Sequence, residues 1–186
     1  VNKQVVELIN QSGGKAVGLT CQDGNTIKAR KKKAKKTEDN VSVDFGLVGD
    51  VESVNVDLLL TLMDDNFVPV VAPIASGERG ETYNINADVV AGKLAETLKA
   101  EKLVLMTNTV GVLDDSGDLI PEIDALTIKS LISKKAISEG MIPKVEAALR
   151  ASERGVKSVH IIDGRVENSL LLEVFTDSGI GTMIRA

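Results

Sequence analysis

Three short polar segments combine residue types that could bind a charged small molecule. Each lies where a predicted strand ends or a predicted helix begins, and each brings amide, carboxylate, hydroxyl or ammonium groups close together. The segments are YNINAD at residues 83–88, TNTVGVL at 107–113 and GMIPK at 140–144.

In YNINAD, Asn86 has the residue type and position of a helix N-cap, and Asp88 falls in the first turn, where the helix dipole favours a carboxylate. A purely structural role explains these two residues. It does not explain Asn84 and Asn86 together, which supply a fork of amide donors and acceptors beside one carboxylate. The segment is therefore a candidate binding site for a polar ligand.

The other two segments favour contact with the backbone and with a phosphate. Thr107 and Asn108 precede Gly111, and a glycine allows close approach of backbone and ligand, although a plain strand exit would look the same. Pro143 is placed for the start of a helix, which puts Lys144 in the first turn, where the dipole disfavours a cation. A helix N-terminus with a lysine is a good phosphate receptor, but an exposed surface lysine is an equally valid interpretation.

Strands and helices alternate along the chain. Apolar runs predict strands, and FVPVVAPI is continuous enough to predict burial on both faces. A hairpin is predicted in which KAVGLT is the first strand, Asp23-Gly24 forms the turn and the return strand begins at Thr26. The strands are KAVGLT, FVPVVAPI, KLVLMT, SVHIID and GTMIRA, and the helices cover 4–9, 55–63, 86–98, 130–135 (with an opening at Thr127), 143–152 and 170–175. The alternation predicts an α/β fold with a largely parallel sheet, whose ligands bind outside the carboxyl ends of the strands.

Composition excludes several classes of protein. The chain has 186 residues and a net charge of -5, with three Phe, one Tyr and no Trp, so stacking platforms for single-stranded nucleic acid are not expected. One Cys and one His exclude a Cys/His zinc site, and we expect no protein-bound metal. The unpaired Cys21 fits a reducing cytosol, and no apolar run approaches membrane-spanning length. We expect a cytoplasmic protein with no membrane partner.

A basic run covers residues 28–36, where seven of nine residues are Lys or Arg and none is acidic. Outside it the chain carries 15 basic and 27 acidic residues. A nucleic-acid surface is one interpretation, and it predicts steeply salt-dependent binding of duplex. The acidic remainder and the missing aromatic residues favour a solvated hairpin extension and no nucleic-acid partner.

Taken together, these motifs resemble the acetylglutamate kinases of the amino acid kinase family. The matching stretches include VNKQVVELINQSGGKAVGLT, GETYNINADVVAGKLAETLKAEKLVLMTN, GMIPKVEAAL, SVHIIDGR and LLLEVFTDSGIGTMI. The resemblance implies a three-layer αβα amino acid kinase fold with a largely parallel open sheet. It also implies transfer of the γ-phosphoryl group of ATP, with Mg²⁺, to the side-chain carboxylate of N-acetyl-L-glutamate in arginine biosynthesis.

The resemblance assigns roles to individual residues. Lys144 would stabilise the transferred phosphoryl group, and Asp88 would hold catalytic lysines in place. Asn84 and Asn86 would bind N-acetyl-L-glutamate. Nucleotide-binding residues would be Thr107, Asn108, Gly111, Val112, Leu113, Ala136, Ile137, Ser138, Gly140 and Met141. Many relatives have Asp where this chain has Asn108, which can still donate and accept hydrogen bonds.

An L-arginine effector site is implied at His160, Glu173 and Gly179, although an exposed glutamate of an amphipathic helix would explain Glu173 equally well. The family's N-terminal strand, glycine loops, second catalytic lysine and substrate-reading arginine have no counterpart here. We therefore expect an N-terminally truncated, inactive ATP-binding part of a kinase that is a homo-oligomer at full length. Residues 1–80 would complete the substrate and central-sheet part, and 81–186 would bind the nucleotide.

Two alternatives remain at this point. Another carboxylate or carbamate kinase of the same family would not prefer N-acetyl-L-glutamate over free glutamate or aspartate. A non-catalytic module for arginine or nucleotide would bind its ligand without turnover.

Overall fold

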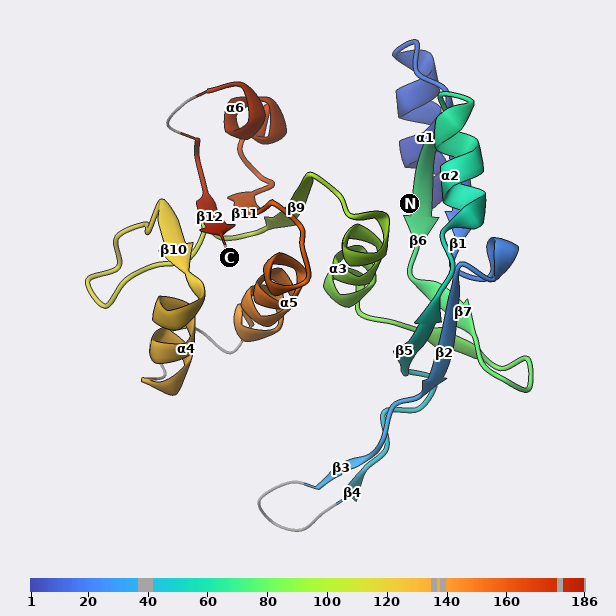
Figure 1. Cartoon of the computed structure of the whole chain (residues 1–186), viewed down its shortest axis with the longest axis horizontal. Coiled ribbons are helices and arrows are strands. Elements are labelled where there is room, and N and C mark those ends of the chain that lie inside the picture. Colours follow the sequence, from blue (N-terminus) through green and yellow to red (C-terminus); the bar gives the residue numbers. More distant parts are fainter. Residues whose placement is uncertain (37–41, 135–136, 138–139, 177–178, 186) are drawn as a thin grey trace. The chain divides into compact units, whose positions relative to one another are not determined.

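The computed structural model describes residues 1–36, 42–134, 137, 140–176 and 179–185 (Figure 1). The chain forms two compact units, Val1–Val90 and Ala91–Ala186. Each contains helices and at least one pair of parallel strands. The predicted α/β class is confirmed, with parallel strand pairs in both units beside antiparallel ones.

The first unit contains a small parallel sheet and a larger, mostly antiparallel one. β1 pairs with β6 in parallel, and the larger sheet has the order β5-β2-β7-β8. β3 pairs with β4 and extends the β2–β5 hairpin. The elements are α1 (Asn2–Gln11), β1 (Ala16–Thr20), the 3₁₀ helix η1 (Asp23–Asn25), β2 (Ile27–Lys31), β3 (Lys35–Lys36), β4 (Ser42–Val43), β5 (Gly49–Val54), α2 (Asp57–Asp64), β6 (Val68–Ala72), β7 (Ile74–Ser76) and β8 (Thr82–Asn84).

The predicted hairpin between KAVGLT and the strand at Ile27 is wrong. β1 pairs with β6, whereas β2 pairs with β5 and β7 in the other sheet. The Asp23 carboxylate accepts a hydrogen bond from the Thr20 N–H at 2.7 Å, and the Ile27 N–H donates to the Cys21 carbonyl at 2.9 Å. These bonds close a turn that passes the chain from one sheet to the other. The solvated extension predicted for the basic run is confirmed as a hairpin whose described basic side chains are exposed.

The second unit has a four-stranded sheet of order β10-β12-β11-β9. β9 and β11 are parallel, as are β10 and β12, while β11 and β12 run antiparallel. Helix α3 (Ala87–Leu98) begins in the first unit and continues into this one. The remaining elements are β9 (Lys102–Thr107), β10 (Glu122–Asp124), α4 (Ala125–Ser133), α5 (Ile142–Glu153), β11 (Ser158–Asp163), α6 (Ser169–Phe175) and β12 (Thr182–Arg185).

Helices cover both faces of this sheet. Val159 and Ile161 of β11 are fully buried in a core shared with α4 and α5, whereas His160 faces Glu173 of α6. Figure 1 shows α6 on one side of the strands and α4 and α5 on the other. Within this unit the layers are therefore helix, sheet and helix, as the family resemblance implied.

Two helix boundaries illustrate how capping sets the fold. α4 covers 125–133 and so begins two residues before the predicted opening at Thr127, because the Asp124 carboxylate caps it by accepting the Thr127 N–H at 2.7 Å. α5 begins at Ile142 with Pro143 in its first turn, as predicted. Among the described residues, no helix has the length and apolar character needed to cross a membrane.

Candidate functional site

The carboxyl ends of β9 and β11 lie side by side. Their parallel register pairs Thr107 with Asp163, and the Gly164 N–H donates to the Thr107 carbonyl at 2.8 Å. The loops that leave the two strands therefore begin at one edge of the sheet. Asn108, the next residue of the first loop, is exposed there. This is the edge at which α/β proteins bind ligands.

The loop after β9 is anchored to β12 by a buried hydrogen bond. The Val112 N–H donates to the Thr182 hydroxyl at 2.8 Å. Gly111 has φ of 148°, and a Cβ there would lie 2.6 Å from the Thr182 hydroxyl oxygen. Only glycine fits this close approach. Val112 is buried and Leu113 is exposed, so of these two side chains only that of Leu113 can reach a ligand without rearrangement.

One polar atom in this loop needs an explanation. The Thr109 hydroxyl oxygen is buried and makes no hydrogen bond among the described residues. Buried polar groups in native proteins normally have a partner, and an exception often marks a site where water or ligand binds. Thr109 was not identified from the sequence, because nothing in the local pattern distinguishes a buried hydroxyl from an exposed one.

Lys144 lies toward the same edge of the second unit. α5 precedes β11 through a short turn at 154–157, so the helix runs antiparallel to the strand and its first turn lies toward the strand's carboxyl end. Lys144 is half-buried, and its backbone N–H donates to the Met141 carbonyl at 3.0 Å. The topology therefore brings Lys144 to the edge that holds Thr107 and Asn108.

The remaining residues predicted to bind nucleotide lie between α4 and α5. Ile137 and Met141 are buried, and their side chains belong to the hydrophobic core. Only backbone groups of these two residues could face a ligand. Gly140 is exposed, and Ala136 and Ser138 lie outside the described residues.

In the first unit, YNINAD alternates between buried and exposed residues. Tyr83 and Ile85 are buried, so Asn84 and Asn86 lie together on the opposite, exposed face. The Asn86 side-chain oxygen accepts the Val89 N–H at 3.1 Å, which confirms the predicted N-cap of α3. Asp88, in the first turn, is half-buried. Both asparagines are thus exposed, Asn84 at the end of β8 and Asn86 at the cap of α3.

A buried polar network joins the three residues predicted for an arginine site. His160 Nδ1 lies 2.6 Å from Glu173 Oε1, and Glu173 Oε2 accepts the Ile180 and Gly181 N–H groups at 2.7 and 3.1 Å. Gly179, with φ of 59°, packs against the same carboxylate. The alternative of an exposed Glu173 is wrong: the side chain is 5 % exposed.

The pKa of Glu173 lies below its usual value. Burial raises this pKa, but the hydrogen bonds from Ile180, His160 and Gly181 together outweigh that effect. Both carboxylate oxygens are therefore engaged: Oε2 holds the loop before β12 against α6, and Oε1 joins α6 to His160 of β11.

Sequence reasoning did not identify the ion pair at the end of β11. The Asp163 side chain is 7 % exposed and accepts from Arg165 Nη2 at 2.7 Å and Nε at 2.9 Å, while the Arg165 side chain is 67 % exposed. The hydrogen bonds from the Arg165 side chain and backbone N–H lower the pKa of Asp163 to about 2. The sequence signal is the segment HIIDGR, in which an apolar strand ends in an aspartate that is followed two residues later by an arginine.

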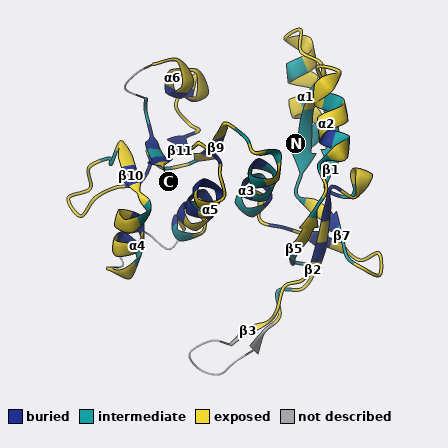
Figure 2. Cartoon of the chain, viewed as in Figure 1, coloured by how far each residue is buried: buried dark blue, intermediate teal, exposed yellow. Residues whose placement is uncertain are grey.

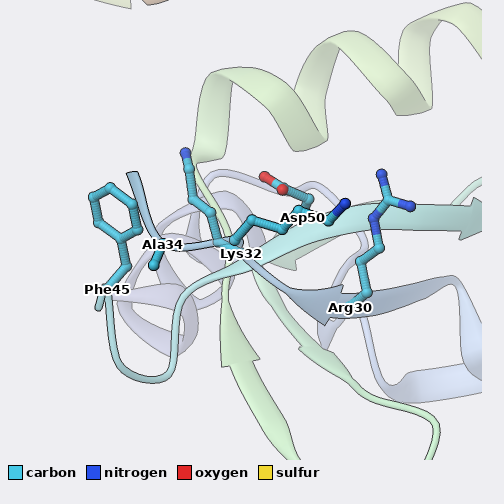
Figure 3. A pocket seen from close by; sticks show the side chains of 6 residues that line it. Arg30, Lys32, Ala34, Phe45 and Asp50 are labelled. Atoms are coloured by element: carbon cyan, nitrogen blue, oxygen red, sulfur yellow. The ribbon is translucent and has the colours of Figure 1, made fainter. Parts of the chain in front are cut away.

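A hollow on the basic hairpin contains none of the residues predicted for the site. Figure 3 shows Phe45, Lys32, Asp50 and Arg30 around it, with the Lys32 ammonium 5.5 Å from the centre of the Phe45 ring. Lys31 nearby pairs with Asp44 at 2.9 Å. The residues that line the hollow are Arg30, Lys32, Lys33, Ala34, Phe45 and Asp50.

Comparison with known proteins identifies the family. Residues 1–163 match the model of the amino acid kinase family. The chain is 57 % identical over its whole length to the acetylglutamate kinase of Chromobacterium violaceum, of which it covers 64 %, and 54 % identical to that of Azoarcus sp., of which it covers 63 %. It thus spans somewhat less than two thirds of these curated relatives.

Solved structures agree with this assignment. An N-acetylglutamate synthase from Neisseria gonorrhoeae, complexed with coenzyme A and L-arginine, has a TM-score of 0.76 at 28 % identity over 92 % of this chain and 38 % of its own. Giardia carbamate kinase shares the fold, with a TM-score of 0.68 at 18 % identity over 99 % of this chain and 67 % of its own. The chain therefore belongs to the amino acid kinase family.

Proposed function

We propose that this chain is part of an acetylglutamate kinase, which phosphorylates the side-chain carboxylate of N-acetyl-L-glutamate with ATP in arginine biosynthesis. The observation that carries the proposal is the 57 % identity to an acetylglutamate kinase along the entire chain. The product is an acyl phosphate. This substrate separates the proposal from kinases of the same family that act on other carboxylates or on carbamate.

The chemistry requires positioning and positive charge more than a base. A glutamate carboxylate, with a pKa of about 4.3, is already ionised at neutral pH and can attack the γ-phosphorus directly. The transferred phosphoryl group then needs cationic stabilisation in flight. Lys144, in the first turn of α5, combines an ammonium group with the positive end of a helix dipole and suits this role.

ATP would bind at the carboxyl edge of β9 and β11 in the second unit. Thr107, Asn108 and Leu113 offer hydroxyl, amide and apolar contacts at the exit of β9. Gly111 and Val112 would keep this loop in shape through the bond to Thr182. Gly140, Ile137 and Met141 would contribute mainly backbone groups, because the two apolar side chains are in the core.

N-acetyl-L-glutamate would bind on the exposed face of YNINAD. An amide of the substrate can exchange hydrogen bonds with Asn84, whose side chain lies on the solvent face of an edge strand. Asn86 shares that face, although its oxygen already caps α3. Asp88 would act indirectly, by holding catalytic lysines in place through charge pairing.

Mg²⁺ would accompany ATP. This ion takes octahedral oxygen coordination and is usually held by substrate phosphates and water with one or two carboxylates. The described part of the chain contains no group of three or more His, Cys, Asp or Glu side chains arranged to hold a metal. The proposal needs none, because the phosphates supply most of the coordination.

L-arginine would act as an effector at His160, Glu173 and Gly179. Its guanidinium group could replace one of the existing hydrogen-bond donors to the Glu173 carboxylate.

We further propose a homo-oligomeric enzyme in the cytoplasm, where the buried free thiol of Cys21 stays reduced. Burial raises the pKa of that thiol to about 11 and keeps it unreactive.

Calorimetry of Mg-ATP binding tests the nucleotide site. We expect saturable binding by the chain and roughly tenfold weaker binding or worse after Lys144→Ala, since a charge-assisted hydrogen bond contributes about 1.5–3 kcal/mol. Lys157→Ala is the matched control, because Lys157 is exposed, directly precedes β11 at the opposite end of the strand, and pairs there with Glu101. A folded chain that binds no ATP at millimolar concentration would contradict the proposal.

The substrate is tested separately by NMR titration of the Asn84 and Asn86 amides. N-acetyl-L-glutamate should shift these signals at lower concentration than glutamate, aspartate or carbamate does. Preference for one of those other compounds would instead support a different kinase of the family.

A further inference from the structure

We propose that Arg165, held by Asp163, binds the phosphate chain of the nucleotide. This rests on the proposed ATP site and adds a residue to it. Arg165 follows β11 by two positions, at the carboxyl edge where the register places Asp163 beside Thr107. The Gly164 N–H, between the two ion-pair partners, donates to the Thr107 carbonyl at 2.8 Å. The exit of β11 is thus fixed directly to the predicted nucleotide loop.

The ion pair differs from an ordinary surface pair. The Asp163 carboxylate is almost fully buried, and it receives three side-chain bonds and the backbone N–H of Arg165. These bonds restrict the guanidinium to one orientation while leaving most of the side chain exposed. An arginine whose freedom is already restricted loses less entropy on binding an anion. Its planar fork also matches phosphate oxygens better than an ammonium group does.

The buried Thr109 hydroxyl supplies a second, independent observation at this edge. It lies two residues beyond Thr107 and makes no hydrogen bond within the described structure. Such a group loses the solvation of its oxygen without compensation unless a ligand or water completes the bond. The hydroxyl has no surface open to solvent, so it marks an uncompensated polar group at this edge, while the ligand contact itself is made by the exposed Arg165.

The test compares ATP with adenosine, which lacks phosphates, on Arg165→Ala, Arg165→Lys and the parent chain. We expect Arg165→Ala to raise the Kd of ATP about tenfold or more and to leave that of adenosine within twofold, since one charge-assisted contact is lost. Arg165→Lys should recover part of the affinity for ATP. Arg154→Ala is the matched control, because Arg154 is similarly exposed and pairs with Glu96.

Every outcome decides between the interpretations. Equal loss for ATP and adenosine would show that the ion pair only shapes the loop, and would overturn direct phosphate contact. An unchanged Kd for ATP would overturn it as well. If the parent chain binds adenosine and ATP equally well, no group contacts the phosphates, and the inference fails while a nucleoside site survives. If it binds neither, the proposed function itself fails. Asp163→Asn should weaken ATP binding less than Arg165→Ala, because the guanidinium remains but is less restricted.

Discussion

Strands β6 and β11 have similar apolar sequences but very different surroundings. β11 is buried along nearly its whole length, with β9 and β12 on its two edges and helices on both faces. β6 pairs with β1 in a two-stranded sheet, and its side chains are exposed or half-buried (Figure 2). The predicted burial of FVPVVAPI on both faces is therefore wrong for β6. An apolar run predicts a strand, but neighbouring elements decide how much of it is buried.

The largest expected effect comes from opening the core around β11. Ile161→Ala removes a fully buried side chain and should lower the free energy of unfolding by about 2–5 kcal/mol. Val70→Ala in the half-buried β6 should lower the free energy of unfolding by about 1 kcal/mol or less, because the Val70 side chain buries less apolar surface on folding than Ile161 does. Urea denaturation followed by circular dichroism measures both. Equal losses would show that β6 is as well packed as β11 in solution.

A smaller loss is expected from the buried carboxylate beneath α6. Glu173→Gln keeps the shape but removes the negative charge that receives the Ile180 and Gly181 N–H groups and the His160 ring, at a cost of about 1–3 kcal/mol. Glu167→Gln, at an exposed position before the same helix, is the control and should change stability by less than about 0.5 kcal/mol. A stable Glu173→Gln variant would mean that the network adds little to the packing of this face.

Local sequence patterns predicted what depends on local geometry. The N-cap at Asn86 and the proline in the first turn of α5 follow from residue type at a fixed position. The exposure of Asn84 and Asn86 on either side of the buried Ile85 follows the twofold period of an extended chain. These features need no knowledge of which strands are neighbours.

What the sequence could not predict depends on register between distant segments. The Asp163–Arg165 pair lies beside Thr107 only because β11 and β9 pair in parallel across more than 50 residues. Glu173 is buried because the loop before β12 folds over it. The hairpin predicted at Asp23-Gly24 fails for the same reason, since β6 occupies the neighbouring position beside β1. Turn residues alone do not choose a partner strand.

The smallest effect should appear in the pH dependence of stability. The pKa of Asp163 is lowered from 3.8 to about 2 by its bonds to Arg165, so its stabilising contribution is complete above pH 4 and is lost as the pH falls toward 2. Asp163→Asn should flatten the curve of unfolding free energy against pH in this interval and leave it unchanged near neutrality apart from a constant offset.

The control is Asp44, which is exposed on the hairpin and whose pKa is also lowered by its bond to Lys31. Asp44→Asn should therefore give no resolvable change in slope in 0.15 M salt, where exposed pairs are screened. If both variants flatten the curve equally, the buried pair and the exposed pair contribute alike, and the anchoring of Arg165 by Asp163 is no stronger than an ordinary surface contact.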